Sequence, residues 1–268
     1  MKNRIRGEFI LKFLIVGDVC GRPGREAFRK YVPELKKEHN IDVVVVNGEN
    51  IAGGRGISRK TLDEIYRAGA DIVTSGNHIW DQKEIVSFID DEPFLIRPAN
   101  YPGGAPGKGY CIYPFKAKNI GVINVSGRTF MPPMDCPFQK VDEILKEIKN
   151  QCDIILVDIH AEATSEKIAM GFYLDGKVTC VVGTHTHVQT ADNRILPKGT
   201  AYISDLGMVG PYNSSLGINV NNAIDKFITC RPVRFEMAEG PNIFSAVVLE
   251  LAEDNSVKSF ERILFNEE

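Results

Sequence analysis

The sequence predicts an α/β layered domain with a mixed sheet, and three observations support this fold class. Short apolar runs rich in β-branched residues recur along the chain and end in Gly, Asp or Asn, which is typical of buried strands. Between the early runs lie segments with helical spacing, and such alternation is typical of α/β folds. Residues 243–266 instead alternate around an "EDNS" turn, which predicts an antiparallel hairpin.

Each expected element is bounded by a change in residue pattern. The expected strands before the hairpin lie at residues 13–18, 41–50, 71–78, 119–127, 152–160, 178–185 and 199–205. The expected helices lie at residues 24–40, 58–70, 81–90, 139–151 and 164–176. Long loops rich in Gly and Pro are expected at 97–110, 126–138 and 207–217. No linker or repeat interrupts the pattern, so we expect one domain over residues 11–268 after a polar extension at residues 1–10.

Composition excludes several classes of function. A formal net charge of −3 provides no basic surface for a long nucleic-acid duplex and no polybasic membrane anchor. The six cysteines are scattered without a CxxC pair, which favours a reducing cytoplasm over a disulfide framework or a zinc ribbon. The start has basic residues before an apolar run, but Lys12 interrupts this run, and "GDVCG" follows in place of a signal-peptide cleavage site.

Polar residues with metal-binding side chains follow several of the expected strands. In an open α/β sheet the carboxyl ends of the strands meet at one crevice, so these side chains are expected to lie together. Four of the five histidines are among them, and His39 at the polar end of a helix is the exception. The residues are Asp18, Glu49, Asn50, Asn77, His78, His160, His185 and His187.

Each of these residues alone has a plainer explanation. A single Asp or Asn after a strand is usually a turn former or a helix cap, and His160 beside Asp158 is typical of a structural histidine. The pair in "GTHTH" is more informative, because two imidazoles one residue apart at a strand end have few structural uses. The joint pattern therefore predicts a metal centre.

The ligand types restrict the choice of metal. Imidazoles, carboxylates and amide oxygens without thiolates suit Mn²⁺, Fe²⁺ or Zn²⁺ in a reactive centre better than a structural zinc site. The candidates are too many for one ion, whereas two ions about 3.5–4 Å apart that share a carboxylate would use them all. Two carboxylates would leave two dications under-neutralised, so the centre would attract a phosphate and make hydroxide available near neutral pH.

The ordered motifs of the chain resemble those of calcineurin-like metallophosphoesterases. They are "GDVC", "NGEN", "GNHIWD", "DIHAEATSEK" and "GTHTH". Within that superfamily the chain is most similar to the YmdB-like family of bacterial phosphodiesterases, and "FMPPMDCPF" and "GMVGPYNSSLG" extend the likeness from about residue 13 to the C-terminus. The resemblance implies a four-layer α/β/β/α sandwich with mixed sheets and a dinuclear centre at the strand ends.

The resemblance also implies a role for each motif residue. The ligands of one ion would be Asp18, Glu49, Asn50 and His187. Those of the other ion would be Glu49, Asn77, His160 and His185, so that Glu49 bridges the two. His78 would lie beside the ions without binding them, as general acid or transition-state stabiliser.

Three positions depart from the pattern of the wider superfamily. Its usual first motif, G-D-x-H, supplies a histidine where this chain has Cys20, and its usual bridging residue is Asp where this chain has Glu49. Asn50 would fill the gap left by the histidine, and Cys20 is either a thiolate ligand or a small apolar residue. The "GNHIWD" motif differs from the commoner GNH followed directly by an acid, which leaves the role of Asp81 open.

Together these inferences predict a phosphodiesterase that depends on two divalent ions, Fe or Mn first and Zn as an alternative. The resemblance implies small cyclic nucleotides as substrates, 2′,3′-cyclic mononucleotides in particular, attacked by a metal-bridged hydroxide. Aromatic residues in the long loops, Tyr101, Phe130 and Tyr212, are candidates for contact with the base or ribose. The resemblance also favours a homo-oligomer.

Two other functions are compatible with the same residues. A phosphomonoesterase or nucleotidase would use the same centre, and a non-catalytic regulator would only bind a nucleotide or a metal ion. The positioned acid His78 argues against the regulator, which has no need of it. Arg22 and Arg55 are the cations near the motifs, and both are expected at solvated positions, so a monoester dianion would find few cationic partners and diesters are favoured.

Overall fold

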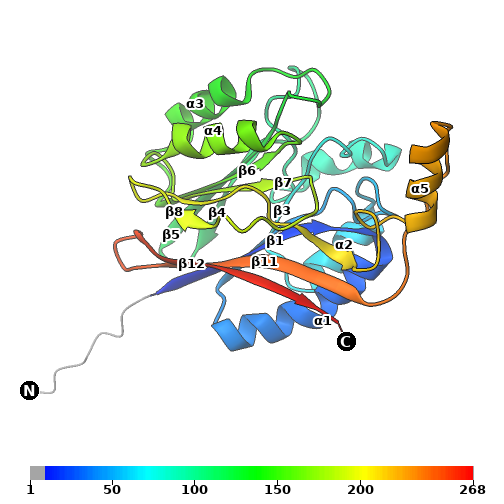
Figure 1. Cartoon of the computed structure of the whole chain (residues 1–268). Helices are drawn as coiled ribbons and strands as arrows, with labels where there is room; N and C mark the ends of the chain where they lie inside the picture. The colour runs from blue at the N-terminus through cyan, green and yellow to red at the C-terminus, as the bar shows by residue number, and fades with distance from the viewer. Residues whose placement is uncertain (1–9, 268) are drawn as a thin grey trace, which may run out of the picture.

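The computed structural model describes residues 10–267 of the chain, which form two stacked sheets with helices outside them (Figure 1). The first sheet consists of β1 (Leu11–Val19), β2 (Val43–Asn47), β3 (Ile72–Thr74), β10 (Met208–Pro211), β11 (Asn242–Leu251) and β12 (Val257–Asn266). The second consists of β4 (Tyr110–Phe115), β5 (Lys118–Ser126), β6 (Ile154–His160), β7 (Cys180–Thr184), β8 (Arg194–Ile195) and β9 (Ala201–Ile203). The helices are α1 (Gly21–His39), α2 (Arg59–Arg67), α3 (Pro137–Ile148), α4 (Thr164–Leu174) and α5 (Val220–Thr229).

The strand order places β1 and β2 inside the first sheet and β5, β6 and β7 inside the second. It is β12-β11-β10-β1-β2-β3 in the first sheet and β4-β5-β6-β7-β9-β8 in the second. Parallel pairs such as β1–β2 and β5–β6 coexist with antiparallel pairs such as β1–β11 and β4–β5, so the prediction of mixed sheets is confirmed.

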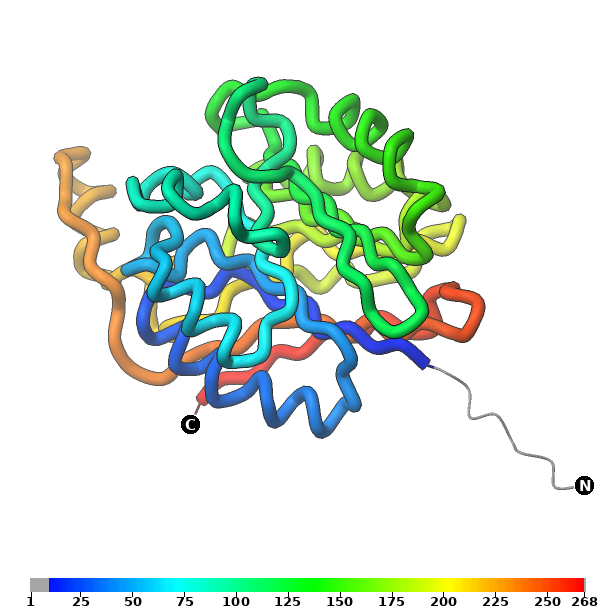
Figure 2. Tube along the Cα trace, turned by 180° about the vertical axis from the view of Figure 1, so that it is seen from behind, coloured from blue at the N-terminus to red at the C-terminus, as the bar shows by residue number. Residues whose placement is uncertain are grey.

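Three buried apolar clusters separate four layers (Figures 1 and 2). One lies between the first sheet and the helices α1 and α2, and it includes Phe28 and Leu62. The second lies between the two sheets and includes Phe13 and Leu156. The third lies between the second sheet and the helices α3 and α4, and it includes Ile144. The prediction of a four-layer α/β/β/α sandwich is confirmed.

The run of four valines in β2 illustrates why these residues form central strands. Val44 and Val46 belong to the cluster under the helices, whereas Val43 and Val45 belong to the cluster between the sheets. Because successive side chains of a strand point to opposite faces, a strand buried on both sides needs a continuous apolar run. The run ends at Asn47, where the chain leaves the core and enters the site described below.

Several elements differ from the expectation. Residues 81–90, expected as a helix, form two 3-10 turns, η1 (Lys83–Ser87) and η2 (Ile89–Asp91). The expected loop at 207–217 contains β10, because its backbone pairs in parallel with β1 at Asp18 and Val19. The strands β4 and β8 and the helix α5 were not expected. No helix within residues 10–267 has the length and apolar character to cross a membrane. The expected extension lies outside the described residues apart from Ile10, and the single domain stays a prediction.

Candidate metal centre

The expected ligands come together from the carboxyl ends of strands in both sheets. The first sheet supplies Asp18 from β1, Glu49 and Asn50 after β2, and Asn77 after β3. The second sheet supplies His160 at the end of β6 and His185 and His187 after β7. Neither sheet alone holds a complete set of ligands, so the site exists only where the two layers meet.

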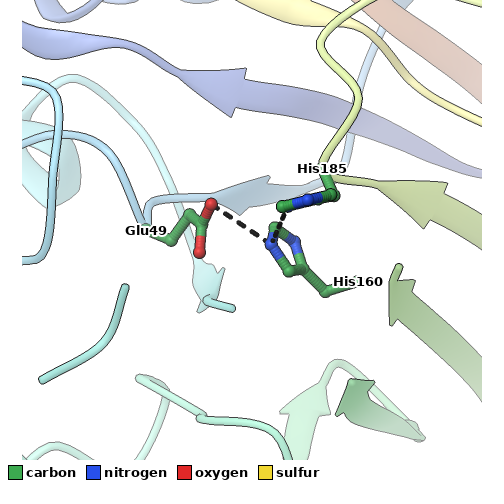
Figure 3. A group of neighbouring side chains, drawn as sticks. All are labelled: Glu49, His160 and His185. Carbon is green, nitrogen blue, oxygen red and sulfur yellow. Dashed lines mark hydrogen bonds and ion pairs between the residues drawn. The ribbon is translucent and has the colours of Figure 1, made fainter. Parts of the chain in front are cut away.

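One group of potential ligands surrounds His160. Its Nε2 lies 3.2 Å from Glu49 Oε1, 3.0 Å from His185 Nδ1 and 3.0 Å from Asn77 Oδ1. In Figure 3 the side chains of Glu49, His160 and His185 point toward one another. Adjacent ligands at right angles around an ion are about 3 Å apart when each bond is about 2.1 Å long. These atoms therefore have the spacing of neighbouring ligands of one ion.

A second group consists of Asp18, Glu49 and His187, whose potential ligand atoms lie within 4.8 Å of one another. Asp18 Oδ1 is 3.8 Å from His187 Nε2 and has no hydrogen-bond partner among residues 10–267, although Asp18 is fully buried. An unpaired carboxylate oxygen in the interior is costly unless a cation lies opposite it. Glu49 belongs to both groups, which fits the bridging role expected for it.

Asn50 and Cys20 also lie beside His187. The amide nitrogen of Asn50 is 3.2 Å from His187 Nε2 and 3.1 Å from Glu49 Oε1, so ligation by Asn50 requires the amide turned to present its oxygen. The Cys20 thiol donates to the carbonyl oxygen of Asp18 at 3.5 Å and belongs to neither group of potential ligands among the described residues. This geometry favours the small buried residue over the thiolate ligand for Cys20.

Two of the histidines are anchored through the ring nitrogen that faces away from the site. Thr184 donates its hydroxyl to Asp158 at 2.7 Å and therefore accepts the Nδ1 proton of His160 at 2.9 Å. His187 Nδ1 lies 3.1 Å from the carbonyl oxygen of Leu216. Such partners fix the tautomer, so that Nε2 of both rings is free to bind a metal ion.

His185 is oriented the opposite way. Its Nε2 lies 3.1 Å from a carboxylate oxygen of Glu162, which leaves Nδ1 unprotonated and directed at His160. Burial lowers the pKa of His185 to about 3, so the ring is neutral near pH 7. The neutral imidazole is the form that binds metal ions. Glu162 had no expected role, although it lies in the "DIHAEATSEK" motif.

The two buried carboxylates have opposite shifts in pKa. Burial raises the pKa of Asp18 to about 7, against the attraction of His187 and His160. Burial also opposes ionisation of Glu49, but the charge and hydrogen bond of a protonated His160 outweigh it and lower the pKa of Glu49, and a metal ion would displace that proton from His160. A cation opposite the unpaired oxygen of Asp18 would favour its ionised form as well. The donor set therefore fits metal ions better than it fits an empty site.

The "GTHTH" turn is held by a buried ion pair below it. His185 and His187 have φ values of 102° and 63°, which non-glycine residues adopt rarely. Between them, the backbone nitrogen and hydroxyl of Thr186 donate to Asp205 Oδ2 at 3.0 and 2.7 Å. Lys167 Nζ donates to the same oxygen at 2.6 Å, and both charged side chains are about 1% exposed. The pair compensates for the backbone strain and fixes the separation of the two imidazoles.

Gly76 leaves the space that the ligands occupy. A Cβ atom at this position would lie 2.3 Å from Glu49 Oε2 and 2.3 Å from His160 Nε2. Only a residue without a side chain can follow β3 here, because the ligands of both sheets close over it.

We expect Gly76→Ala to abolish metal binding, because the methyl group would separate Glu49 from His160. Elemental analysis of the purified variant should find its metal content reduced from the native value to near zero. Gly103→Ala is the matched control, since a Cβ at Gly103 has no atom within 4 Å. Native metal content in Gly76→Ala would contradict the geometry of the centre.

His78 stands beside the ligands on a short turn. Its backbone nitrogen donates to Glu49 Oε2 at 3.1 Å, and its Nδ1 is 2.9 Å from Asp81 Oδ2. Neither nitrogen of the ring belongs to a ligand group among residues 10–267. The sequence left the role of Asp81 open. Its contact with Nδ1 orients the ring of His78 and leaves Nε2 of His78 free.

Four of the seven expected ligands line one cavity of about 290 Å³. Besides Glu49, Asn50, His78, His185 and His187, its lining includes the apolar side chains of Leu216, Ile218 and Met237 and the cation Arg55. Arg55 is exposed, as expected of a solvated residue, yet it also faces this cavity. Arg22 instead pairs with Glu26 on α1 at 2.8 Å.

The three aromatic residues expected to contact substrate are not part of this lining. Tyr101 packs against Trp80 with ring centroids 5.7 Å apart, and it is half-buried. Phe130 is 90% exposed and Tyr212 is 48% exposed. The apolar contacts of the cavity come instead from Leu216 within the "GMVGPYNSSLG" loop, from Ile218 just after it and from Met237 after α5. Sequence reasoning missed these three residues.

The fold is of the calcineurin-like metallophosphoesterase type, with the ligand groups at the strand ends where that type holds its metals. The chain belongs to the YmdB-like family, whose model matches residues 14–263.

Proteins similar to this chain are found among curated sequences and solved structures. The chain is 51% identical over 260 residues to the 2′,3′-cyclic-nucleotide 2′-phosphodiesterase of Bacillus subtilis, covering 96% of this chain and 98% of that protein. A crystal structure of a hypothetical protein from Thermus thermophilus matches with a TM-score of 0.91 and 40% identity, over 96% and 100% of the two chains. A crystal structure of a novel phosphatase from Mycoplasma pneumoniae matches with a TM-score of 0.92 and 35% identity, over 97% of this chain and 95% of that chain.

Proposed function

We propose that this chain is a phosphodiesterase that hydrolyses 2′,3′-cyclic nucleotides with the help of two divalent ions. The observation that carries the proposal is that two groups of potential ligands share Glu49 beside the His78–Asp81 pair, and that Glu49 and His78 line one cavity. The similarity to a 2′,3′-cyclic-nucleotide 2′-phosphodiesterase supports the substrate class. Iron or manganese, a homo-oligomeric assembly and a cytoplasmic location are parts of the same proposal.

The metal ions, when bound, would supply positive charge for the phosphoryl oxygens and lower the pKa of the attacking water. The carboxylates and imidazoles of both sheets would hold them, with Glu49 common to both. Glu49 also accepts the backbone N–H of His78, so the ring of His78 keeps a fixed position relative to the ligands. This preorganisation is the main contribution of the protein to phosphoryl transfer.

His78 would act as the general acid. Its Nδ1 proton is held by Asp81, so Nε2 is the nitrogen that can deliver a proton into the cavity. The oxygen of water forms a bond to phosphorus and gives up one proton to solvent, the P–O2′ bond breaks, and O2′ takes the proton from His78, which solvent then restores. The products are a free 2′-hydroxyl and a 3′-phosphomonoester. Asp81 would stabilise the imidazolium before it gives up this proton.

We expect the enzyme to prefer diesters to monoesters, because Arg55 is the one cation that lines the cavity among the described residues. A diester carries a single charge, whereas a monoester dianion gains from further cations around its oxygens. The ratio of kcat/KM for 2′,3′-cyclic AMP to that for AMP should be at least about tenfold, which corresponds to about 1.4 kcal/mol of transition-state binding. Both substrates are measured with Mn²⁺ at one pH.

The same measurement separates the alternatives. Faster turnover of the monoesters would overturn the diester assignment and establish a nucleotidase. Metal-loaded protein that turns over neither class would instead support a non-catalytic regulator. Release of 3′-AMP from 2′,3′-cyclic AMP, followed by chromatography, identifies the bond that breaks, because cleavage of P–O3′ would give 2′-AMP.

A further inference from the structure

We infer that a second nucleotide of the substrate binds in a cavity next to the metal centre, so that the substrates include short oligoribonucleotides ending in a 2′,3′-cyclic phosphate. This inference rests on the proposed function and extends its substrate class. The observations that carry it are the adjacency of two cavities, the charges that line the outer one and the rigidity of the loop between them.

The second cavity adjoins the first at Arg55. It measures about 370 Å³ and is lined by Arg55, Lys226, Pro232, Val233 and Phe235. Arg55 also lines the cavity of about 290 Å³ at the metal centre, so the two cavities are neighbours that share this side chain as a wall. Figures 1 and 2 show α5 and the segment after it at the side of the molecule, where this outer cavity lies.

The lining of the outer cavity has the chemistry of a nucleotide site. Two of its five residues are cations and none is an acid. Within residues 10–267 neither Arg55 nor Lys226 forms a salt bridge, so both charges are available for an anion. Phe235 and Val233 add an aromatic and an apolar surface on which a base can stack. A phosphate flanked by a base satisfies both features.

Arg55 stands on an ordered loop that also carries metal ligands. The loop runs from Glu49 to Gly56, and Gly53, Gly54 and Gly56 adopt φ values of 67°, 94° and 74°. Their positive φ values allow the chain to turn tightly. Ala52 N donates to Gly56 O at 3.0 Å, and Gln82 Nε2 donates to Arg55 O at 2.9 Å. The backbone that carries the guanidinium of Arg55 is therefore fixed relative to the metal centre.

The volumes favour a ligand larger than one nucleotide. Pockets for bound small molecules usually measure about 300–1,000 Å³, and the inner cavity alone, at about 290 Å³, lies just below that range. When the terminal cyclic phosphate lies at the metal centre, the next phosphate of an oligonucleotide is attached through the 5′ oxygen of the same ribose. That phosphate would meet Arg55 and Lys226, and its nucleoside would lie against Phe235.

The chemistry also defines the reaction that supplies such a substrate. Cleavage of RNA by attack of a 2′-hydroxyl on the adjacent phosphate leaves a 2′,3′-cyclic phosphate on the 5′ fragment. The chain would act after this class of reaction and convert the cyclic end to a 3′-phosphate with one molecule of water. No oxidant, reductant or further reactant is required.

The test compares kcat/KM for 2′,3′-cyclic AMP with that for the dinucleotide ApA ending in a 2′,3′-cyclic phosphate, both with Mn²⁺. We expect the dinucleotide to be favoured by about fivefold, the size typical of a partly exposed ion pair. In Lys226→Gln the ratio should fall to about one. Lys146→Gln, which removes an exposed cation from α3, is the matched control and should keep the native ratio.

Two outcomes overturn the inference while leaving the proposed function intact. One is turnover of 2′,3′-cyclic AMP by the native protein without any preference for the dinucleotide. The other is a preference that survives in both Lys226→Gln and Arg55→Gln. Absence of turnover of the cyclic mononucleotide would instead refute the proposed function itself. Because the preference depends on charge, it should also decrease as the salt concentration rises.

Discussion

Replacement of Glu49 with Gln is expected to reduce metal affinity by more than about 100-fold, beyond the loss typical of outer-shell partners, and to abolish turnover with it. Glu49 is the residue shared by both ligand groups, and it is 1% exposed. Its Oε1 faces His160, while its Oε2 accepts the N–H of His78. Glutamine keeps the shape but offers one oxygen and no charge, so it cannot serve two cations.

The measurement is the number of metal ions per chain by elemental analysis, together with kcat/KM for 2′,3′-cyclic AMP. Glu143→Gln is the matched control, because Glu143 is exposed on α3 and pairs with Lys140 far from the ligands in the sequence. A Glu49→Gln protein with two bound ions and near-native turnover would remove Glu49 from the bridging role.

Replacement of His78 with Ala should keep both ions and lower kcat by about 10²- to 10⁴-fold, the usual loss when a general acid is removed. The ring belongs to neither ligand group among residues 10–267, and the backbone N–H that contacts Glu49 remains in the variant. The metal content should therefore stay at the native value while turnover falls.

A substrate with an acidic leaving group provides the decisive comparison. Bis(p-nitrophenyl) phosphate releases a phenolate that needs no proton, so the His78→Ala protein should retain a larger share of native activity on it than on 2′,3′-cyclic AMP. Equal losses on both substrates would show that His78 stabilises the phosphoryl group and is not the acid. Loss of a metal ion would count against both roles.

Much of the fold could be predicted because the central strands are buried on both faces. Such strands need apolar runs, and the runs of β1, β2, β6 and β7 are therefore visible in the sequence. The strand β10 was missed because "MVGP" is short and contains Gly and Pro, and only its pairing with β1 makes it a strand. The helix α5 was missed although Val220, Ala223, Ile224, Phe227 and Ile228 have helical spacing, and in the structure only Ala223 of this stripe is buried.

The ligands of the site could be predicted because they are polar residues that follow apolar strand runs in the sequence. The structure brings together all seven expected ligands, but their assignment to two ions stays a prediction. Long-range partners could not be predicted, because the ion pair Lys167–Asp205 joins residues 38 apart. The substrate-contacting aromatics were chosen from loop composition, which does not determine the direction of a side chain. The sequence also predicted that Arg55 is exposed, but it could not predict that its side chain lines a cavity.

The pairing of β1 has a consequence for the order in which the chain folds during synthesis. β1 carries Asp18 near the N-terminus, yet its neighbours are β2 on one side and β10 and β11 on the other. Residues Leu11 to Val16 pair with a strand that ends at Leu251. A ribosome delivers this partner only after every other strand of the two sheets except β12 has been made. Until then residues Leu11 to Val16 have an unpaired edge, whereas Asp18 beyond them already has its partners in β2 and β10.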